Sequence, residues 1–216
     1  MTADLHPSTQ LRAAAWVPDD DPQRQWDEAI ALAAEWIWER SEVEEIRPVL
    51  VSNTIESAAG MGHAELDEIV RAGGHATPAS RTRYDHCPVL AFVPNERSLH
   101  FAMDLARGYS LSVVEGSSFA LAEWAASVDA VNLLTGQAQT SQIPDDVRRD
   151  LDFAILDGSR NGWTGSDERA QAQRCLAEHI RTGRLTPDQA AAYALTSSSV
   201  SDRGAKRLRE LLARNR

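Results

Sequence analysis

The chain has 216 residues, of which 43% are hydrophobic and 25% charged, a balance typical of a globular protein that excludes disorder as the dominant state. No apolar run reaches the roughly 20 residues that span a bilayer, and the N-terminus lacks the basic and apolar regions of a signal peptide. Cys87 and Cys175 show no metal or redox spacing. We therefore expect a cytoplasmic protein with free thiols and no membrane contact.

Charge is distributed unevenly along the chain. Residues 167–216 hold ten Lys or Arg and six Asp or Glu, while the whole chain has a net charge of −10, so residues 1–166 carry −14. A body this acidic repels phosphate, which disfavours nucleic acid as a partner of the protein as a whole. The basic tail predicts either a contact with the acidic body or a contact with an anionic partner.

The N-terminal region predicts an arm followed by a helix. Residues 1–20 mix Pro, Ser, Thr and Asp, a composition typical of a flexible N-terminal arm. Asp21 and Pro22 are suitable as the N-cap and first residue of a helix. The apolar residues that follow at helical spacing predict one buried stripe, formed by Trp26, Ile30, Ala33 and Ile37.

Short apolar segments alternate with helical patterns in the middle of the chain. The apolar segments are continuous and rich in β-branched residues, as in strands covered on both faces, and they span 48–52, 88–93, 110–114 and 130–134. Helical patterns separate them at 64–72, 97–107 and 119–127. Strands alternating with helices of this length form right-handed βαβ units. Residues 21–142, including the leading helix, therefore predict an α/β fold with a Rossmann-like three-layer core of about four parallel strands.

The C-terminal residues, 143–216, predict a helical part packed on this core. Helical stripes cover 144–156 and 167–181. Thr186–Gln189 is a capping box with Pro at the first helical position. No tether rich in Gly, Ser or Pro separates this part from the core, so we expect it to dock, with Trp163 and the first stripe at the contact. The oligomeric state is not predicted.

Ligands of an open parallel sheet bind beyond the carboxyl ends of the strands. The polar residues placed there form the candidate ligand-binding set: Asn53, Thr54, Glu56, Asn95, Glu96, Glu115, Ser117 and Ser118. The sequence contains neither G-x-G-x-x-G nor G-x-x-x-x-G-K-[ST], and carboxylates near helix N-termini repel phosphate, which disfavours a dinucleotide or a nucleoside triphosphate. No nucleophile motif occurs, so catalytic residues and cofactors stay unassigned.

Three functions remain open at this point. The leading hypothesis is a non-catalytic binding or regulatory module that uses the strand tips for a small ligand or a protein partner. The second is a metal-dependent enzyme in which Glu56, Glu96 and Glu115 hold a divalent cation, although the same carboxylates could simply complement helix dipoles. The third is nucleic-acid contact through basic residues of the last helix, namely Arg203, Lys206, Arg207 and Arg209.

Two further segments, residues 74–86 and Pro88–Asn95, also allow predictions. Residues 74–86 form a long connection before the second strand, and we expect a surface loop that begins at the end of the sheet opposite to the strand tips. The segment Pro88–Asn95, followed by a helix, resembles the strand-to-helix step in the second lobe of helicase-type motor domains. This resemblance covers a small part of the chain and lacks the motifs that carry ATP chemistry, so it implies a generic Rossmann-like unit and no family.

Overall fold

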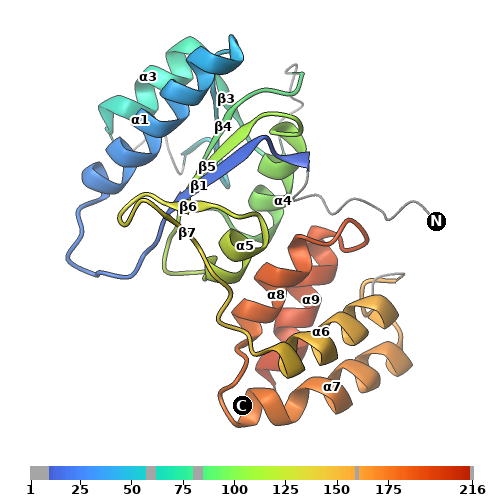
Figure 1. Cartoon of the computed structure of the whole chain (residues 1–216). Helices are drawn as coiled ribbons and strands as arrows, with labels where there is room; N and C mark the ends of the chain where they lie inside the picture. The colour runs from blue at the N-terminus through green and yellow to red at the C-terminus, as the bar shows by residue number, and fades with distance from the viewer. Residues whose placement is uncertain (1–9, 57–61, 80–84, 159–160, 215–216) are drawn as a thin grey trace.

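A single mixed sheet forms the centre of the protein in our computed structural model, which describes residues 10–56, 62–79, 85–158 and 161–214 (Figure 1). The strands are ordered β3-β2-β4-β5-β1-β6-β7. Their bounds are β1 Ala13–Val17, β2 Val49–Val51, β3 His75–Ala76, β4 Val89–Phe92, β5 Ser110–Val114, β6 Val131–Asn132 and β7 Gln137–Ala138. The first six strands of this order run parallel, and β7 pairs antiparallel with β6. The predicted α/β class is confirmed, but the sheet has seven strands where about four were expected.

Strand β1, which lies between β5 and β6, is inside the segment that was predicted to be a flexible arm. Residues 13–17 pair with β5 in register from Ala13 opposite Ser110 to Val17 opposite Val114. The prediction is wrong for these residues, because three alanines have a weak intrinsic preference for strands and only burial between two neighbours makes the strand stable. Residues 1–9 of the predicted arm lie outside the described residues.

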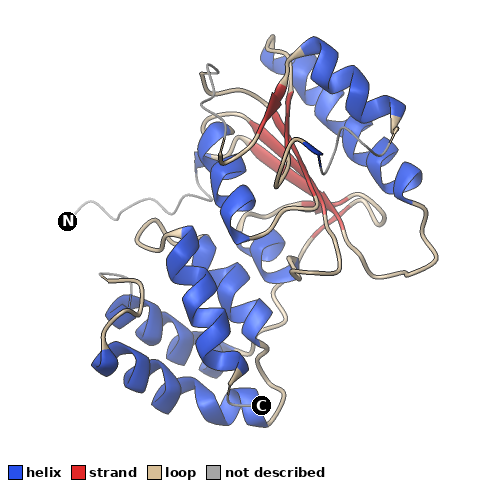
Figure 2. Ribbon diagram, turned by 180° about the vertical axis from the view of Figure 1, so that it is seen from behind, coloured by secondary structure: helices blue, strands red, loops and turns tan. Residues whose placement is uncertain are grey.

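Two helices cover each face of the sheet, which gives three layers (Figures 1 and 2). Helices α1 (Trp26–Glu44) and α3 (Ala64–Ala72) pack on one face, and α4 (Glu96–Leu105) and α5 (Ala122–Ser127) on the other. Successive strand residues alternate between these faces, so that Val89 faces α4 and α5 while Leu90 faces α1. Strands β2 and β4 are therefore continuously apolar, as predicted for a sheet covered on both sides.

Helix α1 starts later than the sequence predicted. Asp21 does not cap it, because its side chain accepts a hydrogen bond from the Gln23 N–H at 2.9 Å and closes a separate turn. The helix begins at Trp26. The predicted stripe is buried at Ile30, Ala33 and Ile37, whereas Trp26 at the first turn is 40% exposed.

The segment 74–86 contributes the short edge strand β3, which the sequence did not predict. His75 pairs parallel with Leu50 of β2, and its Nε2 lies 2.7 Å from the Ser52 hydroxyl. Because β3 is parallel to β2, the chain leaves it at the strand-tip end, where Arg97 donates to the Pro78 carbonyl at 3.2 Å. The segment begins opposite to the strand tips, as expected, because the Gly74 carbonyl accepts from the Leu50 N–H near the start of β2. The expectation of a plain loop is corrected by β3, a strand of two residues that is too short to show a pattern in the sequence; residues 80–84 lie outside the described residues.

The C-terminal part consists of helices α6 (Asp145–Gly158), α7 (Ser166–Arg181), α8 (Pro187–Leu195) and α9 (Asp202–Ala213). The predicted capping box is present, with the Gln189 N–H 3.1 Å from the Thr186 hydroxyl. Helix α8 packs on α5 and α4, and α9 packs on α4, while α6 and α7 lie farther from the sheet (Figure 1).

Trp163 is buried inside this helical part. Its ring lies against Gly158 and Gly204, and a Cβ on Gly158 would come within 2.1 Å of the indole. The core contact is made by α8 and α9. One continuous apolar cluster runs from the α4–α5 face of the sheet into these helices, so the interface is built like a protein interior.

Candidate functional site

The topology places a crevice at the carboxyl ends of β1 and β5. These strands are neighbours, but β1 leads to α1 on one face and β5 leads to α5 on the other, which is the arrangement that opens a crevice in parallel sheets. We call it the tip crevice; its lining residues are Val17, Pro18, Asp19, Arg24, Gln25, Trp26, Ala29 and Glu115. Its volume of about 20 Å³ exceeds the roughly 10–15 Å³ that one water molecule requires.

Glu115 is the buried acidic group of this crevice. Its carboxylate accepts hydrogen bonds from the Leu121 N–H at 2.6 Å and the Asp19 N–H at 3.1 Å, so it connects the loops that follow β5 and β1. Burial raises the pKa of Glu115 to about 7, against the opposing effect of the two backbone hydrogen bonds and with a small contribution from nearby aspartates. Glu115 therefore changes charge near neutral pH.

The rim of the tip crevice is acidic and aromatic. Arg24 is the one arginine among the described residues that line the crevice. Its guanidinium is paired with Asp20 at 2.7 Å and donates to the Pro18 carbonyl at 2.7 Å. The partly exposed indole of Trp26 meets the buried Phe92 ring edge-on, with centroids 5.8 Å apart. The rim thus offers negative charge and an exposed aromatic surface.

The strand-tip residues at the ends of β2 and β4 form hydrogen bonds with one another. The Asn53 amide donates to the Val93 carbonyl at 2.9 Å and accepts from the Ser98 hydroxyl at 2.6 Å. Asn95 caps α4 by accepting from the Ser98 N–H at 3.0 Å. Sequence reasoning missed Ser98, although an Asn followed three residues later by Ser just before a helical stripe is a readable capping signal. These side chains position α4 rather than offer groups to a ligand.

Backbone strain marks the same end of the sheet. Val93, directly after β4, has φ +46°, a left-handed conformation that is rare for a β-branched residue. Its side chain fills the space beside Gly116, where a Cβ would lie 2.4 Å from the Val93 Cγ1. Strained residues of this kind concentrate at functional sites, because the surrounding structure must hold them in place.

Arg209 of α9 connects the helical part to the strand tips. Its guanidinium pairs with Glu96 at 2.9 Å and Asp188 at 2.6 Å, and donates to the Ser118 carbonyl at 2.7 Å. It also lies over the Phe119 ring, 5.2 Å from the centroid. Two predicted site residues, Glu96 and Arg209, are therefore partners of each other.

The remaining predicted residues are dispersed. Thr54, Glu56, Ser117 and Ser118 are exposed. Among the residues that the structure describes, no group of three or more His, Cys, Asp or Glu could hold a metal ion, so Glu56, Glu96 and Glu115 are not brought together as a metal site. On α9, Arg207 donates to the Gly162 carbonyl at 2.8 Å, and of the four predicted basic residues Arg203 and Lys206 are exposed while Arg207 and Arg209 are half-buried.

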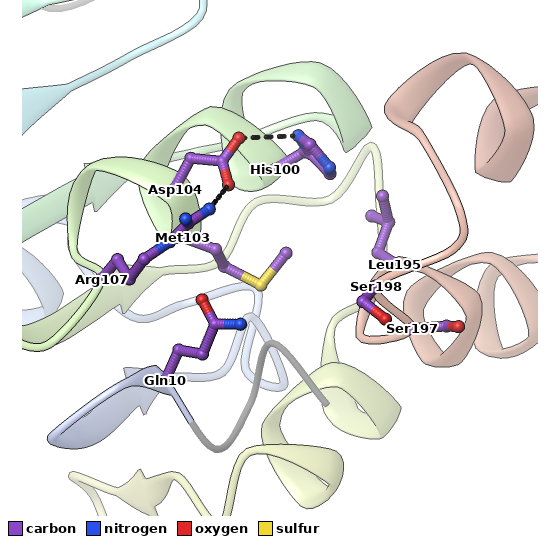
Figure 3. A pocket seen from close by; sticks show the side chains of 8 residues that line it. All are labelled: Gln10, His100, Met103, Asp104, Arg107, Leu195, Ser197 and Ser198. Atoms are coloured by element: carbon purple, nitrogen blue, oxygen red, sulfur yellow. Dashed lines mark hydrogen bonds and ion pairs between the residues drawn. The ribbon is translucent and has the colours of Figure 1, made fainter. Parts of the chain in front are cut away.

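A larger cavity, which the sequence did not indicate, lies at the other end of α4 (Figure 3). It has a volume of about 190 Å³ and lies between α4 and the turn from α8 to α9. His100, Asp104 and two serines line it, yet within the described ranges no hydrogen bond joins His100 to Ser197 or Ser198. The cavity therefore contains no assembled nucleophile of the Ser–His type.

No helix in the described part of the chain is both long and apolar enough to span a membrane. Comparison of the chain with known protein families, with characterised proteins and with solved structures finds no match.

Proposed function

We propose that this protein is a non-catalytic binding module that takes the ammonium group of a small ligand into the tip crevice. The observation that carries the proposal is Glu115, a buried carboxylate at the point where the connections of β1 and β5 diverge. A Rossmann-like use of the sheet, with the ligand beyond the strand tips, is part of the proposal.

The dimensions of the crevice support a small cationic group. A volume of about 20 Å³ suits one group of the size of a water molecule, which an ammonium group matches. A carboxylate has about four lone-pair positions, and the two backbone hydrogen bonds of Glu115 leave others for a ligand donor. Asp19 and Asp20 add negative charge nearby, and Asp27 and Glu28 lie in the first turn of α1.

The aromatic rim supports an apolar or aromatic remainder of the ligand. The Trp26 indole is 40% exposed beside the crevice. An indole face attracts cations and stacks with rings, at about 0.5–1 kcal/mol for exposed sites. The ligand would place its ammonium group near Glu115 and its remainder over Trp26.

Tyramine and its neutral analogue tyrosol test the proposal, because they share the ring and differ in the ammonium group. At pH 8, tyramine should raise the melting temperature and give a calorimetric binding signal, and tyrosol should not. Glu115→Gln should abolish the signal, whereas Glu56→Gln, which changes an exposed strand-tip carboxylate outside the crevice, should preserve it. Equal binding of tyrosol would contradict the proposal.

The pH dependence gives a second readout. An ammonium ligand favours the charged carboxylate, and the pKa of Glu115 is about 7. Lowering the pH from 8 to 6 should therefore weaken tyramine binding by about tenfold, because most Glu115 side chains are then protonated. The metal-dependent alternative predicts instead a rise in melting temperature with Mg²⁺ or Mn²⁺, which we do not expect because Glu96 is paired with Arg209 and the described residues form no group of three metal ligands.

A further inference from the structure

The cavity at the C-terminal end of α4 is a site of a different kind from the tip crevice. Its volume of about 190 Å³ is well above the roughly 10–15 Å³ that one water molecule requires, so it has room for several water molecules. Its walls come from α4, from residues 195–198, and from Gln10 ahead of β1 (Figure 3). The cavity exists only because the helical part packs on α4, so both parts of the chain form it.

Asp104 is the one carboxylate among the described residues of the cavity wall, and it is already paired. One oxygen of Asp104 accepts from Arg107 Nη2 at 3.0 Å, and the other lies 3.5 Å from Nδ1 of His100. Both contacts are drawn in Figure 3. A cationic ligand would have to displace one of them, so the wall does not favour an amine.

Hydrogen-bond donors, in contrast, are left over. The Arg107 guanidinium has five N–H groups, and Asp104 is its one side-chain partner among the described residues. Neither the Gln10 amide nor the Ser198 hydroxyl, which also line the cavity, forms a hydrogen bond to another residue that the structure describes. Figure 3 shows the Gln10 amide extending into the space between α4 and the turn at 195–198. Several donors around one space favour a ligand rich in acceptors, and an arginine favours a carboxylate.

The floor of the cavity is apolar and fixed in position. Met103 is 6% exposed and Leu195 is 1% exposed. The Met103 sulfur accepts from the Trp124 indole N–H at 3.2 Å, which holds the side chain in place. A ligand carrying a short hydrocarbon chain would cover this floor and displace water from it.

We infer that this cavity binds a small carboxylate with a short apolar chain, about six to nine non-hydrogen atoms in all. The carboxylate group lies against Arg107, with Gln10 and Ser198 as further donors. The hydrocarbon chain lies on Met103 and Leu195. The site is independent of the tip crevice and of the ammonium ligand proposed for it.

Isovalerate and isovaleramide test this inference, because they have the same shape and differ in charge. Titration followed by amide NMR resonances should move signals of residues 100–107 and 195–198 with isovalerate, at a dissociation constant on the order of 1 mM. Isovaleramide should bind at least about fivefold more weakly. Absence of any shift in these signals, or equal binding of the amide, would overturn the inference.

Two variants and one matched control locate the site. Arg107→Gln should weaken isovalerate binding by about tenfold or more, the usual effect of losing a charged hydrogen bond. Ser198→Phe should block binding without changing charge, since Ser198 is exposed and lies at the cavity wall. Arg97→Gln makes the same charge change at the other end of α4 and should leave binding unaltered. If Arg97→Gln weakened binding as much as Arg107→Gln, or if Ser198→Phe bound normally, the site would be assigned wrongly.

Discussion

The two ends of helix α4 lie in contrasting surroundings. At its N-terminal end, Asn95 and Ser98 are bonded to one another and to Asn53, and Glu96 is held by Arg209. At its C-terminal end, His100, Asp104 and Arg107 surround a cavity of about 190 Å³, and their contacts are partly exposed. One end is closed by internal hydrogen bonds, and the other leaves donors facing open space.

This difference shows that the place where the fold predicts a ligand and the place where unpaired polar groups are available need not be the same. The rule for parallel sheets points to the strand tips, and a crevice is indeed found there, but most polar groups around it serve the protein itself. The cavity with unused donors arises where α8 and α9 pack on the sheet layer. A cavity of this origin follows from tertiary packing and has no motif.

The strand-tip end should be the more sensitive of the two to loss of packing. Phe92 is 2% exposed and lies beneath Trp26, so Phe92→Ala should lower the free energy of unfolding by about 3–5 kcal/mol. Phe153→Ala is the control, because Phe153 is 52% exposed on α6 and should change stability by less than about 0.5 kcal/mol. Denaturant unfolding measures both. A loss below about 1 kcal/mol for Phe92→Ala would show that this end is not tightly packed.

Glu115 should make stability depend on pH. Its pKa rises from 4.5 in the unfolded chain to about 7 in the folded protein, so the folded state binds the proton more tightly. The stabilisation is complete below about pH 4.5 and is lost as the pH rises through 7, by at most about 3 kcal/mol at 1.4 kcal/mol per pH unit.

Glu115→Gln should remove this part of the pH dependence. The variant and the parent protein should therefore differ in the slope of unfolding free energy between pH 5 and pH 8, measured by denaturant titration at each pH. If the two slopes were the same, Glu115 would titrate near its ordinary value and the tip crevice would carry a permanent charge.

The sequence predicts those structural elements whose pattern lies within neighbouring residues, and it misses those that depend on distant parts of the chain. Helix α3 was predicted over residues 64–72 and is found there, because its apolar spacing and flanks are local features. The capping box at Thr186 was predicted for the same reason. Strand β1 was missed, since its alanines become a strand only between β5 and β6.

The candidate site divides in the same way. Sequence position alone placed Glu115 at a strand tip, but its burial depends on loops that follow two different strands. The pairing of Glu96 with Arg209 joins residues 113 positions apart, and nothing near either residue indicates it. The wall of the larger cavity combines Gln10, α4 and residues 195–198. These segments are far apart along the chain, and no local sequence pattern predicts that they meet.

Arg209 of α9 contacts the N-terminal end of α4 and Arg107 follows its C-terminal end, and the loss of these two arginines should differ in its effect on stability. Arg209→Ala removes contacts to Glu96, Asp188 and a carbonyl, and leaves a carboxylate that is 8% exposed, so we expect a loss of about 1–3 kcal/mol. Arg107→Ala breaks a pair that is about half exposed on both sides and should cost about 0–1 kcal/mol. Equal effects in thermal or denaturant unfolding would remove the proposed contrast between the closed and the open end.

The smallest effect that we expect is the binding of nucleic acid to the outer face of α9. Leu208, Leu211 and Leu212 are buried and dock this helix, and Arg207 and Arg209 are used inside the protein. Arg203 and Lys206 remain exposed, and two phosphate contacts give a salt dependence of only about two in log–log slope.

Residues 1–166 have a net charge of −14 and include α4, on which this helix packs, so they repel a phosphate backbone that approaches within a Debye length of about 8 Å. We therefore expect no measurable binding of duplex or single-stranded probes at physiological salt in a fluorescence anisotropy titration. The double variant Arg203→Gln, Lys206→Gln should be indistinguishable from the parent protein. Micromolar binding that falls steeply with salt and is lost in the double variant would instead show that the outer face of α9 is a third functional surface, one that acts despite the charge of the body on which it is docked.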